Sequence, residues 1–174
     1  PSMAGRAVVP HDHPLYFHSQ SPAADELRRN ADVMLVVGSR AGNLDVPFDK
    51  YWGDPVRCRV IHVDIDPRHV GVSRPVALGL VADARETLEG LVARLRGRVF
   101  SSAGRIDVAT QRVALETWAI QARAAIASWQ GPGIHPAHAI SAIGAAFGHD
   151  AVYHVDGGMT SLWAALALPQ TQPN

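Results

Sequence analysis

Two aspartates stand two positions apart where an apolar run meets a proline, in the stretch RVIHVDIDPRHVG at residues 59–71. On a strand, Asp64 and Asp66 would point to the same face. Their carboxylates could work as a general acid and base if they are buried together. They could also bind the hydroxyl groups of a ribose, or accept hydrogen bonds from the turn that follows. No nucleophile or metal motif stands beside them, so we favour the turn interpretation over a catalytic pair.

Two other segments follow the end of a predicted strand and contain glycine or an acid, namely Gly38 to Arg40 and Asp156 to Gly158. In open α/β sheets, ligands bind beyond the carboxyl ends of the strands, where backbone N–H groups at helix starts point outward. The sequence contains neither the G-x-G-x-x-G pattern of dinucleotide-binding folds nor the G-x-x-x-x-G-K-[S/T] phosphate loop. The motifs alone therefore give only a weak indication of a bound cofactor.

The nine histidines raise the question of a metal site. His11 and His13 share a loop, and His135 and His138 could share one face of a helix. Neither pair has a third ligand at a recognisable spacing such as H-E-x-x-H. We therefore predict histidines in turns and helix caps, and no metal site. The single cysteine, Cys58, stands beside a strand pattern, and we interpret it as a strand thiol rather than a nucleophile.

Composition narrows the class of protein. The chain has 174 residues, 47% of them hydrophobic, with 16 basic and 16 acidic side chains. A net charge of zero gives no electrostatic reason to expect nucleic acid or a membrane as a partner, and no apolar stretch approaches the ~20 residues that span a bilayer. One cysteine permits no intrachain disulfide, so we expect a cytoplasmic protein. The chain begins without an initiator methionine and stops without a closing helix or strand, and we expect a fragment of a longer protein.

The first hundred residues alternate strand and helix patterns, which predicts an open, mostly parallel α/β sheet. Ser21 and Asp83 are expected to be helix N-caps, and the continuous apolar run at 32–38 predicts a strand covered on both faces. The predicted elements are a short strand at 5–10, a helix at 22–30, strands at 32–38, within 59–71 and at 76–81, and a helix at 84–97. The last helix should bury one face, made of Leu88, Leu91, Val92 and Leu95.

The remaining residues are predicted to be mainly helical. In order, we expect a linker at 97–104, a long helix at 105–130, a helix at 135–147, a strand at 151–155 and a last helix at 159–168. The candidate core contacts of the long helix are Val113, Trp118, Ile120 and Ile126.

Four stretches follow one another in a familiar order: SMAGRAVVPHDHPL, then ADVMLVVGSRAG, then VIHVDIDPRHVG with GLVADARETLEGLVARL, and finally HPAHAISAIGAAFGHDAVYHVDGGMTSLWAA. Together they resemble thiamine diphosphate-dependent enzymes of the acetolactate synthase and pyruvate decarboxylase type. The resemblance implies a three-layer, Rossmann-like α/β central domain with an open parallel sheet of six strands, plus a partial second α/β unit. Residues 1–100 would be the central domain, 101–130 a linker helix, and 131–174 the first part of the diphosphate-binding domain.

The resemblance also implies cofactor contacts. The turn formed by Gly158, Met159, Thr160 and Ser161 would contact the diphosphate of thiamine diphosphate through backbone N–H groups. The family often has Gly-Asn/Gln-His-Gln in this turn, and Met159 and Thr160 depart from that pattern. This departure removes the histidine and amide side chains from the expected contact and leaves the backbone N–H groups as donors.

Some members of the family bind FAD in the central domain, where it is typically structural. The matching positions here are Gly38 and Arg40 for the diphosphate of FAD or another nucleotide, and Asp64 or Asp66 for the adenosine end. Without the family resemblance, the same residues could equally belong to a stand-alone nucleotide-binding or oligomer-interface module.

In this family, the thiazolium carbon of the cofactor loses a proton and attacks a 2-keto acid. The glutamate that activates the cofactor belongs to a pyrimidine-binding domain ahead of residue 1, and the metal-binding Gly-Asp-Gly motif does not occur in this sequence. We therefore expect a fragment of a 2-keto acid carboligase or decarboxylase that has no catalytic residues or metal ligands, binds no cofactor and is inactive alone. The parent enzyme would use thiamine diphosphate and Mg²⁺ and form a homodimer or homotetramer.

Overall fold

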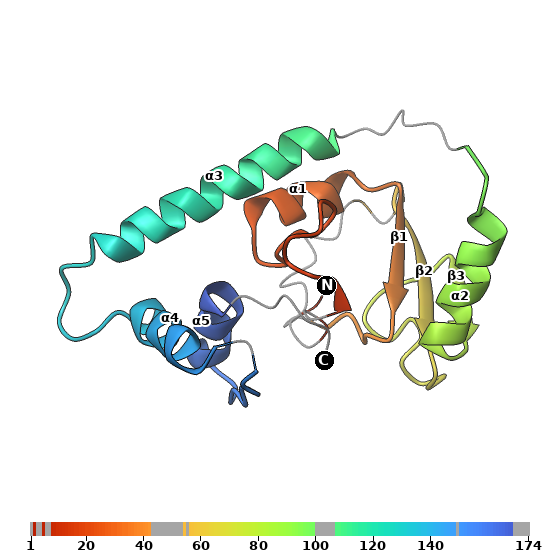
Figure 1. Cartoon of the computed structure of the whole chain (residues 1–174). Helices are drawn as coiled ribbons and strands as arrows, with labels where there is room; N and C mark the ends of the chain where they lie inside the picture. The colour runs from red at the N-terminus through yellow and green to blue at the C-terminus, as the bar shows by residue number, and fades with distance from the viewer. Residues whose placement is uncertain are drawn as a thin grey trace. The chain divides into compact units, whose positions relative to one another are not determined.

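The computed structural model describes residues 2, 5, 8–42, 54, 56–99, 107–148 and 150–168 (Figure 1). The elements are α1 (Pro22–Asn30), β1 (Val33–Val37), β2 (Arg59–Asp64), β3 (Leu78–Val81), α2 (Ala84–Leu95), α3 (Val108–Ala127), α4 (Pro136–Phe147) and α5 (Met159–Ala167). They form two compact units. Unit 1 holds the residues up to His18, apart from Ser2, and those from Arg112 onward, whereas unit 2 holds Ser2 and Ser19–Gln111.

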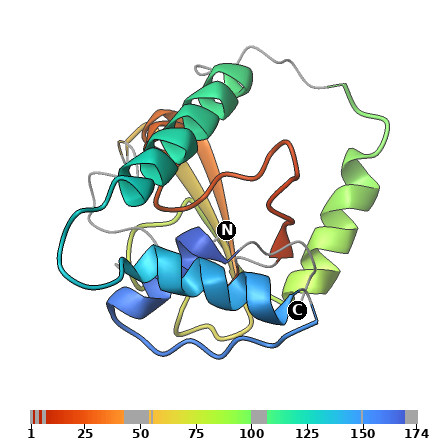
Figure 2. The same ribbon diagram turned by 60° about the vertical axis from the view of Figure 1, so that its left-hand side comes forward.

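Unit 2 contains a parallel sheet with the strand order β1-β2-β3. Leu35 lies beside Ile61, and Ile61 lies beside Leu78, so these three side chains share one face. The strands run side by side, with α1 and α2 on opposite sides of the sheet (Figures 1 and 2). The predicted three-layer, Rossmann-like parallel α/β arrangement is therefore confirmed.

The predicted helix starts of unit 2 are also confirmed. The Ser21 hydroxyl accepts a hydrogen bond from the backbone N–H of Ala24 at 3.2 Å, and Pro22 occupies the first turn of α1. The Asp83 carboxylate accepts one from the backbone N–H of Glu86 at 3.1 Å. Each cap satisfies a donor that the first helical turn leaves without an intrahelical partner.

The expectation that the strand at 32–38 is covered on both faces is wrong. Val33 and Leu35 are 44% and 42% exposed, and all four residues of β3 are exposed. Burial is concentrated in β2, where Val63 is completely inaccessible. Because β1 and β3 are the edges of the described sheet, only β2 has a strand on each side. The prediction that α2 buries one face is also wrong, because Leu88, Leu91, Val92 and Leu95 are all exposed.

Unit 1 is helical. α4 and α5 pack closely through small residues, because Ala137, Ala164 and Ala165 are buried, and a Cβ on Gly144 would lie 3.0 Å from the side chain of Leu168. The segment at residues 11–18 contacts α3 and α5 through hydrogen-bonding groups. Arg112 of α3 donates to the carbonyl of Tyr16 at 2.9 Å, and the Nε2 atom of His18 lies 3.2 Å from the carbonyl of Ala165 in α5.

Several predictions in unit 1 need correction. Val113 and Ile120 of α3 are 64% and 63% exposed instead of buried, and Leu115 is the buried residue of that helix. The predicted strand at 151–155 is irregular, since no described strand lies beside it to complete a hydrogen-bond ladder. In the predicted strand at 5–10, Val8 instead donates to the carbonyl of Gly5 in a tight turn. Arg6 and Ala7 lie outside the described residues, as does the linker beyond position 99.

Candidate functional site

The carboxyl end of β1 turns sharply into a loop that faces the neighbouring strand. The backbone N–H of Gly38 donates to the carbonyl of Val63 at 2.9 Å. Gly38 has φ +61°, which favours glycine, and a Cβ at this position would meet no atom of the described residues within 4 Å. Beyond it, the hydroxyl of Ser73 donates to the carbonyl of Arg40 at 2.6 Å. Two loops therefore meet at the carboxyl ends of β1 and β2, and no atom of the described part of the chain fills the space beside Gly38.

His62 of β2 connects the same two loops, and sequence reasoning missed it. Its side chain is buried, with Nε2 at 2.9 Å from the carbonyl of Ser39. Its Nδ1 atom accepts a hydrogen bond from the backbone N–H of Gly71 at 3.2 Å. Because Nδ1 is an acceptor, the ring proton belongs on Nε2, which donates to Ser39. A histidine inside an apolar strand, two residues before Asp64 and on the same face, is the signal that could have identified it.

Asp64 is the last residue of β2 and is buried. One of its carboxylate oxygens accepts from the backbone N–H of Asp66 at 2.9 Å and lies 3.3 Å from Nδ1 of His69. The backbone hydrogen bond from Asp66, followed by contact with His69, lowers the pKa of Asp64 against the opposing effect of burial. Asp64 is therefore an anion held in place by the start of the turn.

Asp66 binds chiefly Arg68, and it shares His69 with Asp64, because Nε2 of His69 lies 3.8 Å from the Asp66 carboxylate. Its carboxylate accepts from the backbone N–H of Arg68 at 2.9 Å and forms an ion pair with the guanidinium at 2.6 Å. The side-chain hydrogen bond from Arg68 lowers the pKa of Asp66 to about 2. A catalytic pair needs one carboxyl group that keeps its proton near neutral pH. Since both pKa values fall, the geometry favours the turn interpretation of Asp64 and Asp66.

The positions that the sequence points to for a nucleotide are thus partly assembled. Gly38 and Arg40 lie on one loop and Asp64 on the adjacent strand end, all in unit 2. Ionised carboxylates can accept hydrogen bonds from ribose hydroxyls, and an arginine beside open backbone can approach a phosphate. Asp66 is directed to Arg68 instead.

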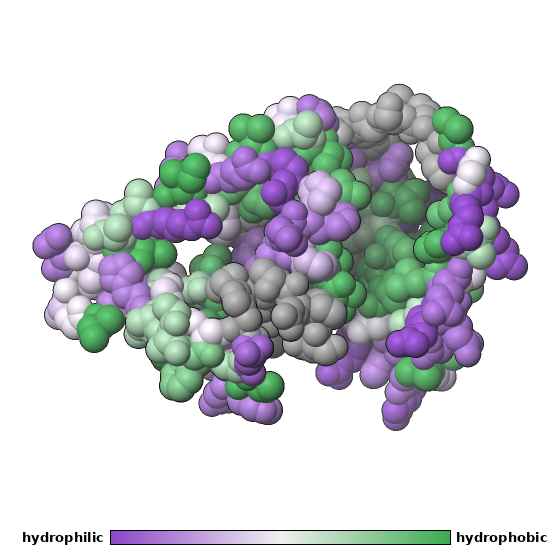
Figure 3. All heavy atoms as spheres, in the orientation of Figure 1, coloured by the Kyte–Doolittle hydropathy of each residue, from purple (hydrophilic) through white to green (hydrophobic). Residues whose placement is uncertain are grey.

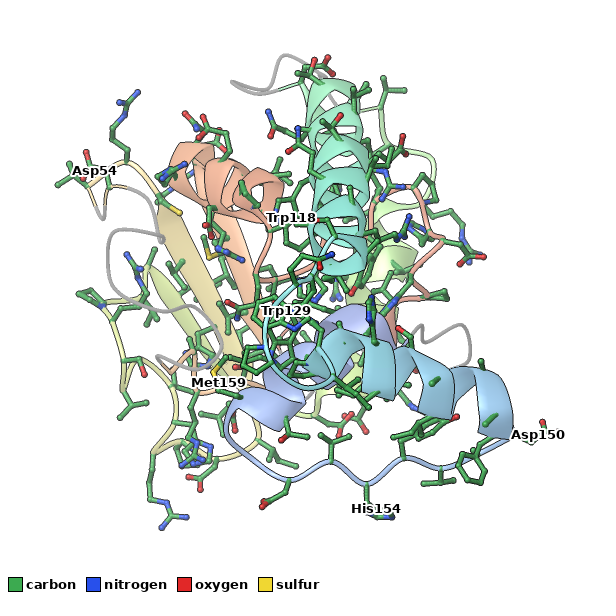
Figure 4. All side chains as sticks on the ribbon, turned by 90° about the vertical axis from the view of Figure 1, so that its left-hand side faces the viewer. Asp54, Trp118, Trp129, Asp150, His154 and Met159 are labelled. Atoms are coloured by element: carbon green, nitrogen blue, oxygen red, sulfur yellow. The ribbon has the colours of Figure 1, made fainter. Side chains whose placement is uncertain are left out.

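The second predicted site lies in unit 1, at the start of α5. Gly158 has φ +78° and occupies the N-cap position, where no side chain caps the helix. The hydroxyl of Ser161 donates to the carbonyl of Gly158 at 2.8 Å, and Asp156 accepts from the backbone N–H of Gly157 at 2.7 Å. Met159 is 64% exposed, at the first position of the helix (Figure 4). The turn therefore presents backbone donors, with no cationic side chain among its predicted contact residues.

Two of the histidines considered as metal ligands, His13 and His135, instead accept hydrogen bonds in a turn and at a helix cap, as predicted. Nδ1 of His13 accepts from the backbone N–H of Leu15 at 3.1 Å, and Nδ1 of His135 accepts from that of Ala137 at 3.1 Å and caps α4. The His135 ring also packs edge-on against Trp163, with ring centroids 4.8 Å apart. Within the described part of the chain, no group of three or more metal-ligating side chains is found. None of the helices described there is long and apolar enough to cross a membrane.

The sequence matches a family model described as "Thiamine pyrophosphate enzyme, central domain" over residues 1–91, about half of the chain. A sulfoacetaldehyde acetyltransferase of Rhodobacter capsulatus is 33% identical over 154 residues, which cover 72% of this chain and 25% of that protein. A probable 2-ketoarginine decarboxylase of Pseudomonas aeruginosa is 36% identical, covering 59% of this chain and 18% of that protein.

An acetolactate synthase large subunit of Corynebacterium glutamicum is 28% identical over 95% of this chain and 26% of its own length. The chain thus spans about a quarter or less of the length of these relatives. The parallel α/β sheet of unit 2 and the match over residues 1–91 agree with each other, and the chain belongs to the family of thiamine pyrophosphate (thiamine diphosphate) enzymes, with its first half corresponding to their central domain.

Proposed function

We propose that the chain is part of a thiamine diphosphate-dependent carboligase or decarboxylase that acts on 2-keto acids and resembles acetolactate synthase. The observation that carries this proposal is the match of residues 1–91 to the central domain of such enzymes. The names of the relatives add support, because they include an acetyltransferase, a 2-ketoarginine decarboxylase and an acetolactate synthase. The parent would be a cytoplasmic homodimer or homotetramer that uses Mg²⁺ with the cofactor.

The start of α5 fits a diphosphate through its backbone. No atom of the residues that the structure describes lies within 4 Å of a Cβ placed on Gly157 or Gly158, so a phosphate group could approach the N–H groups of the first helical turn. In the proposed site, the hydroxyl of Thr160 adds a donor, while Met159 contributes only apolar surface. When bound, thiamine diphosphate supplies a nucleophilic thiazolium carbon and an electron sink. In this chain, the role of Gly158 to Ser161 is to hold the diphosphate end.

The proposal divides the chain into a central domain at 1–100, a linker helix at 101–130 and the beginning of the diphosphate-binding domain at 131–174. The family's activating glutamate and its Gly-Asp-Gly motif are both missing from the sequence. We therefore propose that the chain is inactive alone and depends on further parts of the parent.

Two measurements test this proposal. The purified chain should show no consumption of pyruvate above the uncatalysed rate with thiamine diphosphate and Mg²⁺ present, and measurable turnover would show that the catalytic parts were misplaced. The DNA on both sides of the coding sequence should continue into a glutamate-bearing α/β domain upstream and a Gly-Asp-Gly motif followed by asparagine downstream. In-frame stop codons directly at both ends would refute the parent enzyme.

A second candidate function is the binding of FAD or another adenine nucleotide at the carboxyl ends of β1 and β2. It is favoured by the open space beside Gly38 and by the anionic state of Asp64. Titration of the chain with FAD should change the flavin absorbance near ~450 nm, a property of the cofactor itself. Arg40→Ala should weaken this change, whereas Arg94→Ala on α2 serves as a matched control. Equal binding by both variants would place the nucleotide elsewhere.

A further inference from the structure

Residues 11–18, which we call the N-terminal segment, belong by their contacts to the same compact unit as α3 and α5. The family model assigns residues 1–91 to one central domain. The hydrogen bonds of this segment with Arg112 and Ala165 nevertheless span 96 and 147 positions of the chain. The segment therefore has a role in unit 1 that its place in the sequence does not indicate.

The N-terminal segment is anchored on α3. Tyr16 is buried, and its ring stacks on His11 with the ring centroids 4.5 Å apart. Arg112 donates to the carbonyl of Tyr16 at 2.9 Å, and its guanidinium lies 5.9 Å from the centroid of the Phe17 ring. These contacts fix the backbone directly before His18.

His18 reaches from this anchor to α5. Its ring lies near Trp118 of α3, with centroids 5.9 Å apart, and its Nε2 atom lies 3.2 Å from the carbonyl of Ala165. Because a carbonyl can only accept, Nε2 carries the ring proton and donates it. In a helix, the N–H four positions later would bind this carbonyl, but that residue is Pro169, which has no N–H. His18 therefore supplies a hydrogen bond that Pro169 cannot make.

This hydrogen bond differs in kind from the packing of α5 on α4. That packing uses small apolar side chains, with Ala164 and Ala165 buried and Gly144 close to Leu168. Figure 3 shows pale green, moderately hydrophobic side chains over these two helices. Apolar packing has no preferred direction, whereas a hydrogen bond fixes one atom against another. The bond from His18 therefore defines the position of α5 more sharply than the packing does.

The other end of α5 is the turn from Gly158 to Ser161. Within the part of the chain that the structure describes, no side chain caps this end of the helix. The helix has nine residues, and at 1.5 Å per residue it is about 13 Å long, so it moves as one short rigid element. The position of the turn therefore depends on the contacts made by the rest of the helix.

We propose that His18 is a positioning residue for this turn. It holds the last turn of α5, and through the helix it determines where the backbone N–H groups at the start of α5 point. That these groups face a diphosphate rests on the proposed function, whereas the dependence of the turn on His18 does not. The N-terminal segment thus acts on the helix that carries the proposed diphosphate contacts.

Backbone NMR of the full chain tests this proposal with three variants. His18→Ala removes the donor, and His18→Gln keeps an amide donor near the position of Nε2. His154→Ala is the matched control, because His154 is exposed on the irregular segment ahead of α5 and points away from the helices (Figure 4). If His18→Ala fails to fold by circular dichroism, His18→Asn takes its place, since its shorter side chain does not reach the position of Nε2.

His18→Ala should shift the backbone amide resonances of Thr160 and Ser161. The amide of Leu168, which donates to the carbonyl of Ala164 at 3.0 Å, should exchange with solvent about fivefold faster, as expected for one lost hydrogen bond. His18→Gln should restore both properties. Because glutamine has no ring, that restoration would trace the shifts to the hydrogen bond and not to a ring current. His154→Ala should leave both unchanged.

Three results would overturn the inference. The first is an effect of His18→Ala that is absent or confined to Leu168, since His18 would then cap the helix without positioning the turn. The second is the same change in His18→Gln as in His18→Ala. The third is an equal change in His154→Ala. These measurements need neither cofactor nor substrate, so they can fail while the proposed function holds, and the reverse.

Discussion

Replacing His62 should loosen the connection between the two loops at the carboxyl ends of the strands. Its ring donates to the carbonyl of Ser39 at 2.9 Å and accepts from the N–H of Gly71 at 3.2 Å. His62→Ala removes both partners, and each buried polar group left without one costs about 1–3 kcal/mol. Part of this cost is recovered where water reaches the loops. We therefore expect the free energy of unfolding to fall by about 3 kcal/mol.

Two conservative variants separate the contributions of the two hydrogen bonds. His62→Gln places an amide donor near the position of Nε2 and can retain the bond to Ser39, whereas His62→Asn places an acceptor near Nδ1 and can retain the bond from Gly71. Each should lower the free energy of unfolding by about half as much as alanine. The sum of the two losses should approach the alanine value, unless the bonds reinforce each other.

Urea unfolding followed by circular dichroism measures the stability, and hydrogen exchange of the Gly71 amide gives the local readout. That amide should exchange at least about tenfold faster in His62→Ala and His62→Gln, and stay protected in His62→Asn, since a lost ~1.4 kcal/mol corresponds to a tenfold change. An alanine variant within about 0.5 kcal/mol of the unsubstituted chain, with Gly71 still protected, would refute the reasoning.

Three further predictions concern the helices and the turn after β2. Ser21→Ala removes the N-cap of α1 at a completely buried position and should lower stability by about 1 kcal/mol; urea unfolding checks this, and an unchanged stability would contradict the cap. Arg68→Ala should raise the pKa of Asp66 from about 2 toward its ordinary value, as measured by NMR titration of the carboxyl carbon; an unchanged pKa would contradict the ion pair. Because the folded pKa is lowered, Asp66 stabilises the fold above about pH 4, and this contribution is lost as the pH falls toward 2. Arg112→Ala should make the chain easier to cleave near Tyr16 in limited proteolysis, since it loses the hydrogen bond to that carbonyl.

Much of the fold could be predicted because it depends on local chemistry. The caps at Ser21 and Asp83 and the helices that follow them depend on residues within a few positions of the chain, and the structure confirms them. Strand formation at 151–155 could not be read in this way, since an apolar run becomes a strand only where another strand pairs with it. The exposure of Val113 similarly depends on which elements reach that side of α3.

The candidate site was also only partly predictable from the sequence. The sequence indicated that Gly38 and Asp64 end neighbouring strands, and the structure brings their loops together through His62. The sequence could not show whether Asp64 and Asp66 act as a pair, because that depends on which donor each carboxylate meets in the folded turn. The roles of Gly158 to Ser161 and of Arg40 remain predictions that rest on the family.

By itself, the sequence determined the family and the alternation of strands and helices, since ordered motifs and periodic apolar residues are properties of the linear chain. Only the tertiary structure decided that His62 links two loops and that Asp64 and Asp66 accept from different backbone N–H groups while sharing His69. It alone also decided that Val33 and Leu35 of β1 are exposed while Val63 of β2 is buried. These features depend on contacts between residues distant in sequence, and such contacts exist only once the chain has packed.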